Sequence, residues 1–120
     1  MDNIEILNHK GQAIASVSGN SLLISEPQDA LDLMAECRYK GADSIIVQEA
    51  NFHSRFFDLK TGLAGDILQK FSTYRMRIAI VGDFTKFTSK SLGDFIFESN
   101  KMGHVNFVGS VEEAKEALAN

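Results

Sequence analysis

A hydroxyl, two glycines and the predicted start of a helix coincide between residues 60 and 65. Thr61 directly precedes Gly62, and Gly65 follows one turn later. The first backbone N–H groups of a helix carry partial positive charge, so this corner could hold an anion, or a phosphate carried by Thr61 itself. The segment lacks the Gly-Lys-Ser/Thr ending of a phosphate loop and is not a dinucleotide fingerprint. The structural alternative is that Gly62 and Gly65 let a helix pack close to a sheet.

Polar residues follow the predicted buried strands. In an open α/β sheet, sites form beyond the carboxyl ends of the parallel strands. That rule selects residues 49–61, 83–86 and 109–110. The candidate ligand- or partner-binding residues in the first two segments, together with Gly62 directly after the first, are called the rim: Asp58, Lys60, Thr61, Gly62, Asp83 and Lys86.

An imidazole and two carboxylates occur in the same segments. His53 with Asp58 or Asp83 could bind zinc or shuttle protons if these groups converge. Their spacing matches no particular metal or catalytic motif, and surface residues of this kind usually have no such role. We therefore expect a protein that is not an enzyme, with no catalytic residue, no metal and no cofactor.

Five phenylalanines lie in the predicted connections, and four of them are candidate contact residues. Phe52, Phe56 and Phe57 share one connection, and Phe84 lies in the next. Such side chains either fold onto the core or remain exposed as a contact patch. Core packing is the default, but a partner-binding surface or a homodimer interface is a serious alternative, so these four residues are our interface candidates.

Composition limits the class of protein. A chain of 120 residues with 44% apolar content suits one compact α/β domain spanning residues 1–120. A formal net charge of -4 and scattered Lys and Arg argue against nucleic-acid binding. Because Cys37 is the single cysteine, an intrachain disulfide is excluded. The sequence contains no long apolar run, so we expect neither a signal peptide nor a membrane span. We expect a cytoplasmic protein.

The strands are predicted from hydrophobic patterning. Residues 4–7 and 13–17 are short β-type runs around a Gly-containing reversal, which predicts an antiparallel hairpin. Residues 43–47, 77–82 and 105–109 are nearly continuous apolar runs, typical of parallel strands covered on both faces.

Apolar residues at helical spacing lie between and after these strands, and Ser25 is the predicted N-cap of the first helix. The resulting order is ββαβαβαβα: a single mixed sheet with an N-terminal antiparallel hairpin at its edge, followed by parallel β-α units.

Two stretches resemble a known family. Residues 14–19, followed by a turn and a helix, resemble the second strand of the STAS domain, the module of anti-sigma-factor antagonists and sulphate transporter tails. Residues 58–63, Asp-Leu-Lys-Thr-Gly-Leu, are similar to its Asp-Ser-Ser-Gly-Leu-Gly motif, in which the hydroxyl before the Gly accepts a phosphoryl group. The resemblance implies a STAS-like fold with Thr61 as phosphoacceptor and Asp58 as its acidic neighbour. Residues 56–65 and 94–100 also look like a small bacterial family described only as a domain of unknown function.

Three functional hypotheses follow. The first is a non-enzymatic regulatory or protein-interaction module, STAS-like, whose rim docks a protein partner under control of phosphorylation at Thr61. The partner is unidentified, and a second copy of the chain is one candidate. The second is a domain that binds a small anionic ligand or a nucleotide at the same helix start. The third is an enzyme using His53 with Asp58 or Asp83.

Overall fold

A computed structural model describes residues 3–119 and contains one five-stranded sheet in the order β1-β2-β3-β4-β5. β1 and β2 pair antiparallel, and the remaining neighbours pair parallel. Four α-helices accompany the sheet within the described residues, so the predicted order of strands and helices is confirmed. The strands are β1 Asn3–His9, β2 Gln12–Ser18, β3 Ser44–Gln48, β4 Arg77–Val81 and β5 Val105–Val108, and the helices are α1 Pro27–Tyr39, α2 Leu63–Thr73, α3 Lys90–Met102 and α4 Val111–Ala119.

The hairpin turns where the sequence predicts it. Lys10 and Gly11 both have positive φ, 53° and 83°, which suits the two central residues of a tight hairpin turn. β1 pairs with β2 along its whole length, from Asn3 opposite Ser18 to His9 opposite Gln12. β1 is therefore the edge strand at one side of the sheet.

The first helix begins one residue later than expected. Its N-cap is Glu26 rather than Ser25, with Pro27 in the first turn. The Asp29 carboxylate accepts hydrogen bonds from the backbone N–H groups of Ser25 and Glu26, at 2.9 and 3.1 Å. The Asp29 carboxylate, at the third helical position, thus holds the two residues before the helix, as the N3 side chain does in a capping box.

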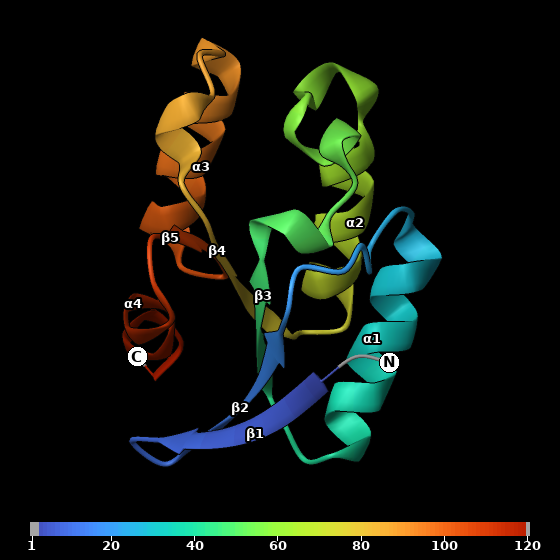
Figure 1. The fold of residues 1–120 in the computed structure, drawn as a ribbon, viewed down its shortest axis with the longest axis vertical. Coiled ribbons are helices and arrows are strands. Elements are labelled where there is room, and N and C mark those ends of the chain that lie inside the picture. The colour runs from blue at the N-terminus through green and yellow to red at the C-terminus, as the bar shows by residue number, and fades with distance from the viewer. Residues whose placement is uncertain (1–2, 120) are drawn as a thin grey trace.

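The helices cover the two faces of the sheet unequally. α1, α2 and α3 pack on one face, where Ile45, Ile78 and Ile80 join the main hydrophobic core. α4 covers the opposite face, where Ala114 and Leu118 form a smaller core with strand residues. Figure 1 shows α1 and α2 on one side of the strands and α4 on the other. Successive right-handed crossovers that step in one direction across the sheet place their helices on the same face, which leaves the last helix free to cover the other.

Arg77, at the start of β4, joins the ends of α3 and α4. Its Nη2 donates hydrogen bonds to the carbonyl oxygens of Gly103 and Ala117, at 2.9 and 2.8 Å, and its Nη1 donates to that of Leu118 at 3.2 Å. A guanidinium at two helix C-termini satisfies carbonyls that lack helical partners and opposes the negative ends of both helix dipoles. One side chain thereby fixes helices on opposite faces relative to the sheet.

The connection from β3 to α2, residues 49–61, consists of three short 3-10 turns: Glu49–Asn51, Ser54–Phe57 and Leu59–Thr61. Phe52, Phe56 and Phe57 lie in this connection and are buried, at 4%, 1% and 8% exposure. Their rings contact one another with centroids 4.2–6.3 Å apart. The alternative of an exposed contact patch is therefore wrong for these three residues, which belong to the core.

Phe84, the fourth interface candidate, is half-buried and packs against the same core. Its ring lies 6.2 Å from that of Phe57 and 5.2 Å, edge to face, from that of Phe107. Most of its apolar surface is used inside the protein, so it provides little of a contact surface.

Candidate functional site

The carboxyl ends of β3 and β4 are joined by an ion pair. Glu49, directly after β3, contacts Lys86 Nζ with its Oε2 at 2.5 Å. The Glu49 side chain is mostly buried, with 17% exposure, whereas that of Lys86 is 54% exposed. To reach Lys86, Glu49 passes across Gly82: a Cβ at this position would lie 2.6 Å from Glu49 Oε1 and 2.7 Å from Glu49 Cβ. Glycine is needed at position 82 because the carboxylate occupies the space of a side chain.

Aromatic stacking strengthens the same junction. The ring of Phe57, from the second 3-10 turn, stacks on that of Phe87 with centroids 5.1 Å apart. Lys86 Nζ lies 5.5 Å from the centroid of the Phe87 ring, within cation–π range. The structure thus brings Lys86 to the residues that follow β3.

Thr61 is exposed and stands at the end of the third 3-10 turn, one residue before Gly62. Its Oγ1 lies 2.9 Å from the carbonyl oxygens of both Arg55 and Asp58, so its single hydrogen is donated toward that pair. The same oxygen accepts a hydrogen bond from the N–H of Leu63 at 3.2 Å. One hydroxyl therefore closes residues 55–63 into a compact loop and partly caps α2.

Gly62 is the N-cap residue of α2, with φ +78°. This left-handed conformation is accessible to glycine at little cost, and no atom lies within 4 Å of the position that a Cβ would take. The glycine is thus required by the backbone turn and not by close packing against the sheet. Lys60 is exposed two residues earlier.

The two rim carboxylates serve their own turns. Asp58 Oδ1 accepts from the N–H of Lys60 at 3.3 Å. Asp83 Oδ1 accepts from the Thr85 hydroxyl at 2.6 Å and from the Thr85 N–H at 3.1 Å. These hydrogen bonds, first that of the hydroxyl and then that of the backbone, lower the pKa of Asp83 below its ordinary value. Both carboxylates stabilise local turns in which their acceptor capacity is partly used.

His53 also has a local role. Its Nδ1 accepts from the N–H of Arg55 at 3.1 Å, so the imidazole caps the second 3-10 turn. Within residues 3–119, no group of three or more His, Cys, Asp or Glu side chains is placed to hold a metal ion. His53, Asp58 and Asp83 each bond inside a separate turn, and this geometry gives no support to the hypothesis of an enzyme.

Two clefts open at the carboxyl ends of the strands. The smaller, about 260 Å³, lies at the ends of β3 and β4 beside the loop after β2 and is lined by Gln48, Glu49, Val81 and Gly82 among others. The larger, about 440 Å³, lies between the segment after β4 and the helices α3 and α4. Asp83 and Phe84 help to line it, whereas the residues from Asp58 to Gly62 do not. The rim is therefore two neighbouring surfaces instead of one pocket.

Asn51 is a structural residue of this region that the sequence does not indicate. Its side chain has no exposed surface, accepts from the N–H of Gln48 at 2.7 Å and donates to the carbonyl oxygens of Gly19 and Ser21 at 3.3 and 2.9 Å. Its own carbonyl oxygen accepts from Leu23 N–H and Ile24 N–H. Asn51 therefore ties the loop after β2 to the loop after β3. A lone Asn in a polar connection carries no sequence signal for this role.

The fold and the rim define a mixed α/β protein with one five-stranded sheet and polar connections at the carboxyl ends of its parallel strands. The chain belongs to the family described as a domain of unknown function, DUF4180, whose model matches residues 9–118. This agrees with the resemblance to a family of that description. No curated protein and no solved structure matches the chain. Among the described helices, none is long and apolar enough to cross a membrane.

Proposed function

We propose that this chain is a non-enzymatic, cytoplasmic regulatory module, STAS-like in kind, that docks a protein partner through the rim and is switched by phosphorylation of Thr61. Two features support the assignment. The hairpin is followed by parallel β-α units, and an exposed threonine stands directly before the N-cap of the helix that follows β3.

The observation that carries the proposal is the position of the Thr61 hydroxyl. Transfer of the terminal phosphoryl group of a nucleoside triphosphate would form a bond from Thr61 Oγ1 to phosphorus and break the bond from phosphorus to the nucleoside diphosphate. The hydroxyl proton would pass to a base of the kinase. The product has no hydrogen to donate to Arg55 O and Asp58 O, both 2.9 Å away. Its negative charge is repelled by these oxygens and attracted to the N-terminus of α2.

The modified side chain must therefore turn from the loop toward the helix. This movement releases the hydrogen bonds that close residues 55–63 and changes the surface beside Lys60. A partner that recognises the closed loop would lose its surface, or a partner that recognises the phosphate would gain one. Either result is a switch at the rim.

Mass spectrometry of the protein purified from its own cells, together with amide hydrogen exchange, tests the switch. We expect phosphate at Thr61. We also expect Thr61→Glu to raise amide exchange in residues 53–62 roughly fivefold to tenfold, as the loss of about 1–1.4 kcal/mol of hydrogen bonding requires. Thr61→Ser keeps the hydroxyl and is the matched control. Absence of phosphate, with the same exchange and the same co-purified partner in Thr61→Glu, would contradict the proposal.

A second candidate is binding of a small anion at the start of α2. Open space over Gly62 and the exposed ammonium of Lys60 favour it. A thermal shift with inorganic phosphate or a nucleotide that is reduced in Lys60→Ala would support this function. Lys60→Ala is preferable to a change at Gly62, because any side chain there is strained by the positive φ. No stabilisation by either ligand would count against it.

A further inference from the structure

The two edges of the sheet differ in whether their outward-facing backbone groups have hydrogen-bond partners from a neighbouring element. At the β5 edge, the N–H of Phe107 donates to Asn100 Oδ1 at 2.7 Å, and Asn100 Nδ2 donates to the Phe107 carbonyl oxygen at 3.1 Å. A side chain of α3 thus occupies the place of a neighbouring strand. At the other edge, β1 is the terminal strand and pairs within residues 3–119 only with β2. Alternate backbone groups along this seven-residue strand point away from the sheet, which is the pattern that pairs with an added strand.

One face of β1 is apolar and incompletely covered. Ile4 and Ile6 pair in register with the core residues Val17 and Ala15, so they point to the face that carries α1, α2 and α3. Both isoleucines are half-buried and pack against the main core. An added strand would extend this face and cover their remaining exposed surface.

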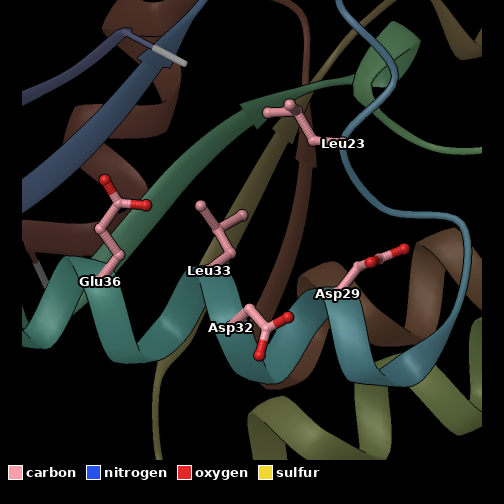
Figure 2. Close-up of a pocket in the computed structure, with 5 residues that line it drawn as sticks. All are labelled: Leu23, Asp29, Asp32, Leu33 and Glu36. Carbon is pink, nitrogen blue, oxygen red and sulfur yellow. The ribbon is translucent and has the colours of Figure 1, made fainter. Parts of the chain in front are cut away.

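The flank of α1 that lies beside this edge is acidic. On its other flank, α1 meets α2: Arg38 donates to the carbonyl oxygen of Tyr74 at 2.6 Å. The side chains of the acidic flank form a shallow pocket of about 130 Å³ together with Leu23, and Figure 2 shows them on α1 with Leu23 opposite: Asp29, Asp32, Leu33 and Glu36. Because α2 occupies the other flank, the acidic flank faces the β1 side of the sheet.

Two of the three carboxylates remain accessible to a partner. Asp29 is used in the cap of α1, whereas Asp32 and Glu36 are exposed, with Asp32 also accepting from Gln28. We propose that the β1 edge is a strand-addition site for an extended segment of a partner protein with Lys or Arg at alternate positions. The aliphatic stems of these residues would lie along Ile4 and Ile6, and their charged ends would reach Asp32 and Glu36.

Charge favours this partner over a second copy of the chain. Antiparallel pairing of two β1 strands about a two-fold axis places both α1 helices on the same face of the joined sheet. The exposed carboxylates of Asp32 and Glu36 would then face their symmetry mates, and like charges at an interface are repulsive. A basic strand converts the same carboxylates into attractive contacts. The strand-addition site contains none of the rim residues, so the test of this proposal is independent of the test of the proposed function.

The test uses a synthetic peptide about as long as β1, in which Lys alternates with Val or Thr, titrated into the full chain and followed by amide NMR. We expect saturable shifts in β1 and α1 and a loss of binding when alternate peptide nitrogens are methylated. The double variant Asp32→Lys/Glu36→Lys should weaken binding roughly tenfold or more. The control Asp94→Lys/Glu98→Lys makes the same change of net charge at exposed positions of α3 and should leave binding within about twofold.

Three results would overturn the proposal: shifts confined to other elements, equal weakening by the two double variants, or undiminished binding of the methylated peptide. A dimer in the free protein, measured by light scattering and accompanied by protected β1 amides, would assign the edge to a second copy instead.

Discussion

Asn51 has no exposed surface and joins the loops that follow β2 and β3 through three side-chain hydrogen bonds. A buried polar group that loses its partner retains most of its desolvation cost. The Asn51→Ala change would leave the N–H of Gln48 and the carbonyl oxygen of Ser21 without these partners. The destabilisation by Asn51→Ala therefore comes more from the backbone groups left without partners than from the loss of the side chain itself.

We expect Asn51→Ala to lower the free energy of unfolding by about 2–3 kcal/mol in urea denaturation. Asn20→Ala, at an exposed position of the same region, is the matched control and should change it by at most about 0.5 kcal/mol. Equal effects of the two changes would show that the buried amide is not what holds the loops together.

Single residues were the hardest feature to predict from the sequence. Thr61 and Gly62 stand at a helix start as expected, because a glycine after a hydroxyl is a local signal that needs no tertiary information. The contacts of Asn51 and Arg77 join segments far apart in the chain, and no local pattern encodes them. The passage of Glu49 over Gly82 was missed for the same reason, since that glycine has an ordinary φ and only its neighbour requires it.

Among the elements, β5 shows how a short strand is secured at an edge. It has four residues, and the side chain of Asn100 satisfies both outward-facing backbone groups of Phe107. Loss of this amide would reopen the edge to pairing with other chains. The role is compatible with an exposed position on α3 because only the end of the side chain reaches the strand.

Asn100→Ala is expected to destabilise the protein by roughly 1 kcal/mol, even though alanine is the better helix former by about 0.5 kcal/mol. The decisive measurement is amide exchange of Phe107, because helix propensity does not affect it. This exchange should accelerate about tenfold, since the N–H of Phe107 loses its acceptor. Asn100→Asp retains an acceptor for the N–H of Phe107 and should accelerate that amide much less. Unchanged exchange of Phe107 in Asn100→Ala would contradict the edge-capping role.

The strands and helices were predictable because their patterns repeat. Continuous apolar runs gave β3, β4 and β5, and helical spacing gave the four helices. The 3-10 turns between residues 49 and 61 were not predicted, because turns of three or four residues are too short to show a period. For the three phenylalanines of this connection, the sequence predicts either core packing or surface exposure, and their burial shows that they belong to the core.

At the scale of the whole molecule, the sheet has a large core on one face and a small one on the other. The order of the elements predicts the strand order of the sheet but not how much apolar surface is buried on each face. The small core under α4 is supplemented by Arg77, whose guanidinium links the ends of α3 and α4 at the start of β4. Opening of the large core should therefore require the cooperative loss of packing from several elements.

Cys37 lies within that core, has no exposed surface and reports on its opening. Burial, with a smaller contribution from the charge of Glu36, raises the pKa of its thiol from 9.0 to about 12. The folded state thus keeps the proton over a range in which the unfolded chain releases it. Stability is unaffected by this group below about pH 9 and falls as the pH rises from 9 toward 12.

The thiol should therefore cost about 1.4 kcal/mol of stability at about pH 10 relative to about pH 8. Urea denaturation of the native sequence and of Cys37→Ala at both pH values isolates this contribution, because every other titratable residue is the same in the two proteins. Cys37→Ala should be less stable than the native sequence at about pH 8, owing to the small cavity that it leaves, and the difference should narrow at about pH 10. A difference that stays constant with pH would mean that the native thiol ionises as freely as in the unfolded chain. In that case the large core would have to admit water around α1 without global unfolding.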